Sequence, residues 1–423
     1  MKISAVWAPI MALATISAAF AQAPGERRDL PSEEVTRGET VLERPRPEYD
    51  PLGIRAGGFL LYPAFAVRQE FNSNVFATDR GEISDFITVI QPSIDLRSNW
   101  NNHSLAFFAN ASIGRYWDET AENYEDFAVG GAGRLDITRQ TQLFVAAAYR
   151  MLHEDRGSPD DVGGREPTEY SQTTASVGLQ QAFNRLSFRI DGVFDRFDYR
   201  DVRSNAGGTI DNDGRDRNQF LARLRMAYEF APLREIYLLT SMNWRNYLDR
   251  RDSAGFDRDS NGFEIAAGLK YDLTGVTFID VFLGYSQQDY QDGRLKTARG
   301  PSGGLKLTWN VTRLTTVTGS VSRDIEETTR IGSSSYFATK ADLRVDHELL
   351  RNLIVSGNAG YQQDSFQGTS RDDSYYRAGI GAKYLFDRNF TLEGGYAFRT
   401  RDSNGPNADF DESVVFLRLV GRI

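Results

Sequence analysis

The sequence predicts an all-β fold, a transmembrane antiparallel up-and-down β-barrel of about eighteen strands, with sixteen as the alternative count. Three observations predict it. Runs that alternate apolar and polar residues recur along most of the chain, the connections between them alternate between short and long, and no stretch after the N-terminus is apolar enough for a membrane helix. Successive side chains of a strand point to opposite faces, so such runs give each strand one apolar and one polar face.

Composition excludes several classes of protein. The 423 residues include no cysteine, which removes disulfides, thiolate metal sites and cysteine nucleophiles together. The net charge is −9, and the basic residues are scattered among acidic ones, so no basic surface for a nucleic-acid partner is expected. Aromatic residues make up 12% of the chain and are frequent near the ends of the predicted strands, for example Trp100, Trp117 and Trp244. Such rings are typical of the girdles at bilayer interfaces; packing in a soluble core is the alternative.

The N-terminus has the three parts of a secretory signal. Lys2 is followed by the mostly apolar stretch 3–20, and Ala19-Phe20-Ala21 fits a small-x-small cleavage site. We therefore predict a signal peptide over residues 1–23, with cleavage after Ala21 or Ala23; a buried first helix is the alternative. Residues 24–56 are charged and rich in proline, which predicts a flexible periplasmic tail. The barrel is expected over residues 57–423.

The first predicted strand covers residues 59–71, long enough for a tilted strand to cross a bilayer, which takes ~9–11 residues. The alternation is clearest in the seventh, where Phe188 and Ile190 alternate with Arg189 and Asp191. The predicted strands after the first are 85–97, 105–116, 127–137, 143–151, 171–183, 186–199, 220–230, 236–247, 263–273, 277–286, 303–311, 315–323, 337–349, 353–361, 375–384, 390–399 and 413–423.

The connections support the same fold independently. Short turns such as 184–185 and 274–275 alternate with long polar segments such as 153–168, 200–218 and 249–261. Outer-membrane barrels have short periplasmic turns and long extracellular loops, so this pattern predicts the bacterial outer membrane as the location and its lipid as a partner. A soluble β-sandwich has shorter strands, and a β-propeller would show a closer sequence repeat.

A local motif resembles a known family. The segments ERPRPEYDPLGIR (43–55), GFLLYP (58–63) and EFNSNVFA (70–77) are similar to the opening of the beta-barrel porin type 2 family. The resemblance implies a Gram-negative outer-membrane barrel. Several family members are encoded among genes for surface-polysaccharide export, so it also implies a periplasmic export partner. Barrel-insertion machinery reads a final aromatic residue in most such proteins; this chain ends in Ile423, yet insertion by that partner is still expected.

Charged residues on the polar faces are the candidate site. On the lipid face each Arg or Lys at mid-depth would cost roughly 2–4 kcal/mol, so these residues are predicted to face a wet lumen. One hypothesis is a pore lining biased toward anions such as acidic sugars; the other is a lattice of ion pairs that stiffens the wall. The predicted pore-lining residues are Arg68, Glu70, Asp95, Arg97, Arg134, Asp136, Arg150, Arg189, Asp191, Arg223, Arg225, Lys270, Lys306, Lys340, Arg344, Lys383, Glu393 and Arg399.

Inward aromatic residues are a second candidate set, because aromatic rings stack on sugar rings. The inward aromatics predicted from the alternation are Tyr62, Phe108, Phe144, Phe197, Tyr199, Tyr237 and Phe282.

Catalysis and metal binding find little support. The three histidines, His103, His153 and His347, have no serine and acid placed for a catalytic triad, so no enzyme activity is predicted. Segments 257–262 and 211–216 resemble the first half of a calcium loop, but Gly268 stands where the closing glutamate of the first would be. The second has Arg215 at a ligand position. We therefore interpret both as solvated loop tips and predict no metal and no cofactor.

The sequence thus predicts a water-filled pore for passive passage or export of polar solutes, linked to surface polysaccharide by the resemblance. The alternative is a non-conducting structural or docking barrel whose periplasmic tail binds a partner. A barrel enzyme is the third hypothesis.

Overall fold

The computed structural model describes residues 39–423. The predicted signal peptide and the first part of the predicted tail, residues 24–38, lie outside the described residues. Within them, no helix is both long enough and apolar enough to cross a membrane.

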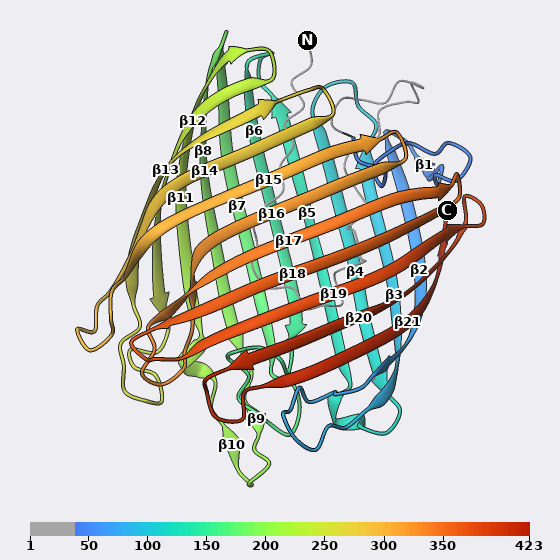
Figure 1. The fold of residues 1–423 in the computed structure, drawn as a ribbon. Coiled ribbons are helices and arrows are strands. Elements are labelled where there is room, and N and C mark those ends of the chain that lie inside the picture. The colour runs from blue at the N-terminus through green and yellow to red at the C-terminus, as the bar shows by residue number, and fades with distance from the viewer. Residues whose placement is uncertain (1–38) are drawn as a thin grey trace. The chain divides into compact units, whose positions relative to one another are not determined.

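The described chain forms an eighteen-strand antiparallel barrel (Figure 1). The strands of its first half are β2 (Phe59–Asn72), β3 (Asp85–Ser98), β4 (Ser104–Tyr116), β5 (Tyr124–Asp136), β6 (Thr141–His153), β7 (Glu169–Phe183), β8 (Leu186–Tyr199), β11 (Arg217–Ala231) and β12 (Arg234–Tyr247). Those of the second half are β13 (Ser260–Asp272), β14 (Thr277–Tyr290), β15 (Ala298–Thr312), β16 (Thr315–Glu327), β17 (Ser335–Leu350), β18 (Leu353–Gln367), β19 (Asp372–Leu385), β20 (Phe390–Ser403) and β21 (Phe410–Arg422).

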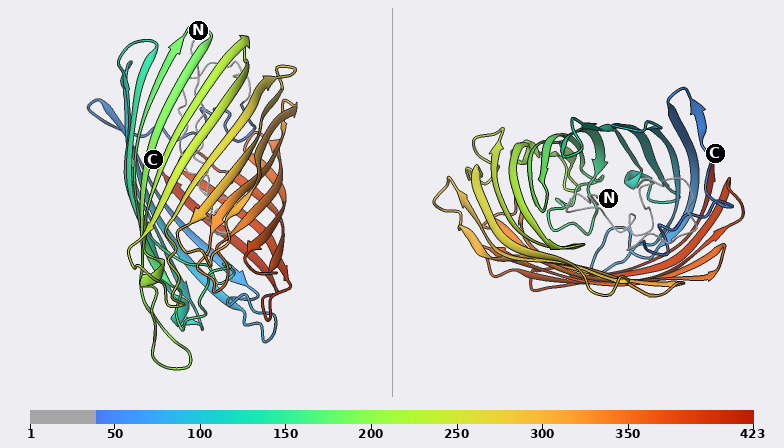
Figure 2. Two further views of the ribbon diagram at one scale, coloured as in Figure 1. Left: turned by 90° about the vertical axis from the view of Figure 1, so that its left-hand side faces the viewer. Right: turned by 90° about the horizontal axis from the view of Figure 1, so that it is seen from above.

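The sheet closes where its first and last long strands meet. β2 pairs with β21 from Ala64↔Arg422 to Asn72↔Val414, and the strands form a ring when viewed along the axis (Figure 2). Beyond the end of β21, the short strand β1 (Ile54–Ala56) takes its place and pairs with Phe59–Leu61. A closed ring satisfies backbone N–H and C=O groups without water, which a strand wall needs in hydrocarbon.

The two faces of the wall follow the alternation. On β8, Ile190 is 57% exposed, whereas the side chains of its two neighbours, Arg189 and Asp191, are only 11% and 14% exposed. On β14, Leu283 is 74% exposed. Apolar side chains therefore cover the outside, and charged ones turn to the inside. The predicted direction of Phe188 and Ile190 away from the lumen is correct.

The ends of the barrel differ as predicted. One end, here the turn end, has connections as short as Asn184–Arg185, while the other, the loop end, has connections as long as that between Tyr199 and Arg217. That connection contains the small hairpin β9 (Val202–Arg203) and β10 (Thr209–Ile210), which protrudes at the bottom of Figure 1. Two 3₁₀ turns also lie at the loop end, η2 (Thr120–Glu122) between β4 and β5 and η3 (Asp213–Arg215) just before β11.

Several strands run further toward the loop end than the predictions. β14 continues to Tyr290, β16 to Glu327 and β18 to Gln367. Apart from Tyr290, Ile325 and Phe366 these extensions are polar on both faces, so the alternation that marks a strand in contact with lipid is lost although the hydrogen-bonded ladder continues.

Part of the predicted flexible tail is bound inside the barrel, which corrects that expectation for residues 39–50, here called the strap. The backbone N–H of Val41 donates to Thr316 Oγ1 at 2.9 Å, and Arg46 pairs with Glu348 at 2.7 Å. Val41 is fully buried and Arg46 is 3% exposed. At its far end Arg422 donates to the carbonyl of Tyr49. A charged segment can be held in place because the barrel wall supplies charged and polar partners for it.

Glycines make room for inward rings. A Cβ at Gly268 would lie 2.2 Å from Tyr237 Cζ, one at Gly304 would lie 2.4 Å from Phe282, and one at Gly114 would lie 2.1 Å from Tyr124. Each ring lies flat over a glycine of the neighbouring strand, an arrangement that restores packing where the glycine has no side chain.

This packing yields a prediction. Gly268→Ala forces the Tyr237 ring away and weakens the 2.6 Å hydrogen bond from its hydroxyl to Asp280. Overpacking of this kind typically costs about 1–3 kcal/mol. The free energy of unfolding from lipid vesicles in urea should fall by that amount. Gly319→Ala is the control, because its nearest neighbour is 3.9 Å away; equal losses for both variants would contradict the account.

Candidate functional site

The inner wall carries the predicted charged residues largely as ion pairs. In five strands an arginine pairs with an acid two residues away on the same face, because every second side chain of a strand points inward. These pairs are Arg68–Glu70 at 2.6 Å, Arg97–Asp95 at 3.8 Å, Arg134–Asp136 at 3.0 Å, Arg189–Asp191 at 2.9 Å and Arg344–Asp346 at 3.0 Å.

Further predicted residues pair between strands or with loops. Arg225 contacts Glu235, and Lys340 contacts Glu326 at 3.2 Å. Glu393 lies between Lys383 at 3.2 Å and Arg418 at 2.9 Å, and Arg399 contacts Glu412 at 2.8 Å. The remaining four, Arg150, Arg223, Lys270 and Lys306, make no ion pair with any described residue.

Sequence reasoning missed many carboxylates on the same face. Some could have been found by extending the alternation into the polar ends of the strands. Asp280 could have been found by pairing neighbouring strands, which places it opposite both Lys270 and Lys306. The missed inward acids include Asp126, Glu235, Glu264, Asp280, Asp324, Glu326, Asp346, Glu348, Asp364, Asp373 and Glu412. With them, the wall carries both signs throughout. This supports the ion-pair lattice over a lining biased toward anions.

Tyrosines line the inside of the wall near the loop end. This tyrosine collar consists of Tyr116, Tyr124, Tyr170, Tyr199, Tyr247, Tyr290, Tyr336 and Tyr375. Tyr170 and Tyr199 stack with ring centroids 5.1 Å apart, and the Arg215 guanidinium lies 4.1 Å above the Tyr199 ring. The collar thus offers flat surfaces for loop arginines, since guanidinium groups are attracted to aromatic faces.

Arginines and wall glycines occupy faces of the predicted inward rings. Arg189 lies 4.4 Å from the Phe144 ring, Arg217 lies 4.4 Å from Phe197, and Arg225 lies 4.1 Å from Tyr237. The structure therefore assigns these rings to the wall lattice.

One connection reaches across the lumen. This crossing loop, residues 154–168, joins β6 to β7, yet it contacts β20 and the connection between β16 and β17, which lie far around the ring. Arg399 donates to Asp155 at 3.0 Å, and the Thr328 hydroxyl donates to Asp160 at 2.5 Å. The Pro159 carbonyl accepts from Arg330 at 2.7 Å. The loop therefore narrows the loop-end mouth.

Buried ion pairs fix the base of the crossing loop. Arg215 donates to both oxygens of Glu154 at 3.0 and 2.7 Å, and Arg156 holds Glu122 at 2.9 and 2.5 Å. Bidentate geometry makes such pairs strong and directional. Burial raises the pKa of Asp161 to about 6, although nearby Arg156 opposes this change.

The tips of β16 and β17 fold inward at the same mouth. Glu327 belongs to the outward face of β16, yet it contacts Arg245 and accepts from the hydroxyls of Tyr247 at 2.7 Å and Tyr290 at 3.2 Å, all on the inner face of other strands. Arg258 donates to the Thr328 and Ser333 carbonyls at 2.8 and 3.1 Å and is 2% exposed. These tips, residues 324–338, are the infolded hairpin; they and the crossing loop meet inside the mouth.

Each histidine has a local partner. His103 Nδ1 accepts from the backbone N–H of Asp136 at 3.0 Å, His153 Nδ1 lies 2.9 Å from Asp126, and His347 Nδ1 lies 2.9 Å from the Thr315 hydroxyl. These contacts tie neighbouring strands together.

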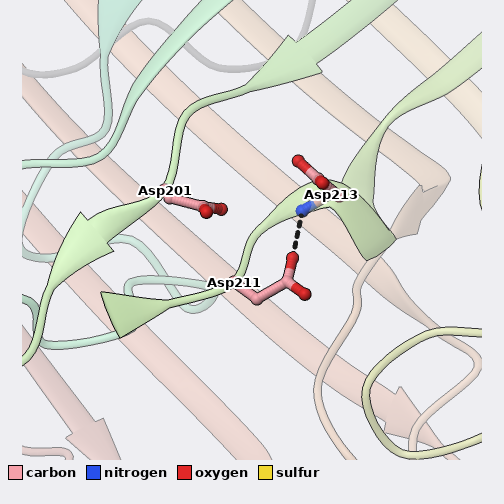
Figure 3. A group of neighbouring side chains, drawn as sticks. All are labelled: Asp201, Asp211 and Asp213. Carbon is pink, nitrogen blue, oxygen red and sulfur yellow. Dashed lines mark hydrogen bonds between the residues drawn. The ribbon is translucent and has the colours of Figure 1, made fainter. Parts of the chain in front are cut away.

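An exposed acidic group lies in the connection between β8 and β11 (Figure 3). Asp201, Asp211 and Asp213 bring carboxylate oxygens within 4.8 Å of one another. Two of these carboxylates accept backbone hydrogen bonds, Asp211 from Asp213 and Asp201 from Asn212, each at 2.9 Å. Two of the acids belong to a segment that the sequence indicated; Asp201 was missed, because it approaches only through the fold of the loop.

Three solved proteins of Pseudomonas aeruginosa are similar to this chain. OpdO shares 16% identity, covers 86% of this chain and 97% of its own, and has a TM-score of 0.45. OccK2 (OpdF), solved in complex with glucuronate, shares 13%, covers 87% and 100%, and has a TM-score of 0.46. A mutant of the ferric enterobactin receptor PfeA shares 10%, covers 86% and 80%, and has a TM-score of 0.46.

No curated protein sequence matches. A family model described as "Putative beta-barrel porin 2" matches residues 46–423, which include almost the whole described structure. The chain therefore belongs to this family of porin-like β-barrels.

Proposed function

We propose that the lumen provides a passive aqueous path for small polar solutes across the outer membrane, narrowed at the loop end by the crossing loop. The observation that carries this proposal is the wall itself, where charged side chains line the inside of a ring whose outside is apolar. A barrel of this size has an interior wide enough for water unless something fills it. Because both charges are present, the path should discriminate weakly between anions and cations.

The link to surface polysaccharide is a narrower form of the proposal. It is supported by the family resemblance. It also requires that the crossing loop move out of the path. An extended saccharide chain passes only if contacts such as Asp155–Arg399 and Asp160–Thr328 release. Single-channel recording in planar bilayers and swelling of vesicles in sugars of increasing size test both forms. Absence of conductance from folded protein would overturn the proposal.

The strap favours a second function, a docking barrel. It lies within the turn end, fixed by Arg46–Glu348, so a partner that docks at this mouth meets a seated segment of the chain. Deleting residues 25–38, which leaves the strap in place, distinguishes the two functions. A pore should keep its conductance and its activity in the cell, whereas a docking barrel should conduct neither before nor after the deletion and should lose its activity in the cell.

Shortening the crossing loop should widen the path. Replacement of residues 158–163 by two glycines removes the Asp160–Thr328 and Pro159–Arg330 contacts. Single-channel conductance should rise about twofold or more, because flow through a pore follows its narrowest section. Deletion of the exposed Ala206 and Gly207 in the β9–β10 hairpin is the control and should change nothing. Unchanged conductance in the shortened protein would place the constriction elsewhere.

The seating of the crossing loop should depend on pH. With its pKa raised to about 6, Asp161 binds a proton more readily in the seated loop than in a released one. Burial also raises the pKa of Asp160. The seated state therefore gains stability as pH falls through 6 and loses it as pH rises, since it binds more protons than the released state.

Transient openings should accordingly be rarer at about pH 5 than at about pH 7.5 in bilayer recordings. Asp161→Asn should remove most of this difference, because an amide does not ionise. Its openings should be rare at both pH values. Openings that become more frequent on acidification would contradict this sign.

Breaking the strap's ion pair should release it. In Glu348→Gln the buried Arg46 guanidinium loses its counter-charge, a change that costs about 3–5 kcal/mol in buried pairs. The strap should then become cleavable by proteinase K, a protease of broad specificity, which the burial of Val41, Arg44 and Arg46 prevents in the native protein. Glu48→Gln removes an exposed charge of the same kind and should leave the strap resistant. Equal resistance of all three proteins would show that the pair does not hold the strap.

A further inference from the structure

The hydrogen-bonded wall is split between β15 and β16 at the loop end. Their pairing starts at Gly303↔Arg323 and runs toward the turn end. Beyond it both strands continue, but Ala298–Ser302 of β15 pair with β14 alone, and Asp324–Glu327 of β16 pair with β17 alone. Pro301 lies in this stretch and has no N–H to donate, so it favours an unpaired edge.

The two edges overlap instead of meeting. Phe337 is on the outward face of β17, because it is an even number of residues from Leu343, which is 49% exposed. Gly300 is on the inward face of β15, opposite the buried Ser286. A Cβ at Gly300 would nevertheless lie 3.3 Å from the Phe337 ring. The outer face of the infolded hairpin therefore packs against the inner face of β15, and the seal along the split consists of side chains.

The split opens at the edge of the apolar band. On β14 the outward residues are Leu283, then Tyr285, which is directly opposite Pro301, and then Gln287, opposite Arg299. Leu283 is 74% exposed and Tyr285 is 42% exposed, so lipid contact ends at this level. Behind the overlap lie polar groups, among them Gln288 and Glu327. A slit here would join an apolar surface to a polar interior.

Two arginines flank the split on its outer side. Arg299 is exposed on β15, and Arg323 of β16 lies 4.6 Å over the Phe337 ring and donates to the Thr339 hydroxyl. Neither makes an ion pair with a described residue. Cations at the bilayer interface attract phosphate or carboxylate groups of lipids.

We propose that the β15–β16 overlap is a closed lateral portal that binds an amphiphile with an anionic head group. Its acyl chain lies between Phe337 and the β15 edge, and its head contacts Arg299 and Arg323. This goes beyond passage of polar solutes along the lumen, because it connects the lumen with the outer leaflet sideways. The head group can belong to a phospholipid, a lipid A or a fatty acid; the shared chemistry is an acidic group on an acyl chain.

Thiol labelling in vesicles tests the portal, and the natural absence of cysteine makes single-cysteine variants clean. Phe337→Cys and Ala338→Cys place thiols at neighbouring, almost equally buried positions, 4% and 1% exposed, on opposite faces of β17. A maleimide carried on a phospholipid acyl chain should label Phe337→Cys at least about tenfold faster than Ala338→Cys, because only the former faces the lipid side when the overlap opens. Leu343→Cys on the lipid face is the positive control.

Competition identifies the ligand. Dodecyl phosphate should slow labelling of Phe337→Cys several-fold, while dodecyl maltoside and inorganic phosphate should protect little. Arg323→Gln in the Phe337→Cys background should abolish the protection by dodecyl phosphate. Protection by dodecyl maltoside equal to that by dodecyl phosphate would overturn the anionic head group. Labelling of Phe337→Cys no faster than of Ala338→Cys would overturn the portal.

Two checks keep the outcomes apart. Thr339→Cys, on the same face of β17, repeats the labelling should the loss of the Phe337 ring disturb folding. Labelling requires no conductance, so a portal without a pore, or a pore without a portal, can each be observed.

Discussion

The structure depends on the need of every backbone N–H and C=O within the membrane to find a partner without water. A strand wall meets this need only if it closes, and the ring from β2 to β21 does so. Closure fixes which of the alternating residues of each strand point outward. Those side chains meet lipid, and the others meet the interior. The alternation of Ile190 with Arg189 and Asp191 is thus the sequence counterpart of a closed ring.

The interior is organised by charge balance at short range. Pairs two residues apart, such as Arg68–Glu70 and Arg344–Asp346, balance opposite charges within five of the strands. The wall therefore needs few long-range partners and leaves the crossing loop as the principal bridge between opposite sides. That bridge depends on Asp155 and Asp160, two half-buried acids whose partners come from β20 and from the connection between β16 and β17.

The strand pattern could be predicted from the sequence because lipid imposes it: wherever a strand touches hydrocarbon, every second residue must be apolar. The prediction weakens where that constraint ends. The polar extensions of β14 and β16 were missed, and with them Glu326 and Glu327. The inward course of residues 324–338 and of the crossing loop rests on single long-range contacts such as Arg258 with the Thr328 carbonyl. Such isolated contacts produce no repeating pattern in the sequence from which they could be predicted. The strap was read as flexible because its charges find partners only in the finished wall, as Arg46 does in Glu348.

The strap also constrains the order of assembly. It precedes the first strand in the chain, yet Thr316 and Glu348, which hold it, belong to β16 and β17. During synthesis these strands appear long after the strap has left the ribosome. The strap therefore has neither of these partners until the late strands have formed. Its binding to the wall must follow the formation of β16 and β17, which makes it a late step of folding.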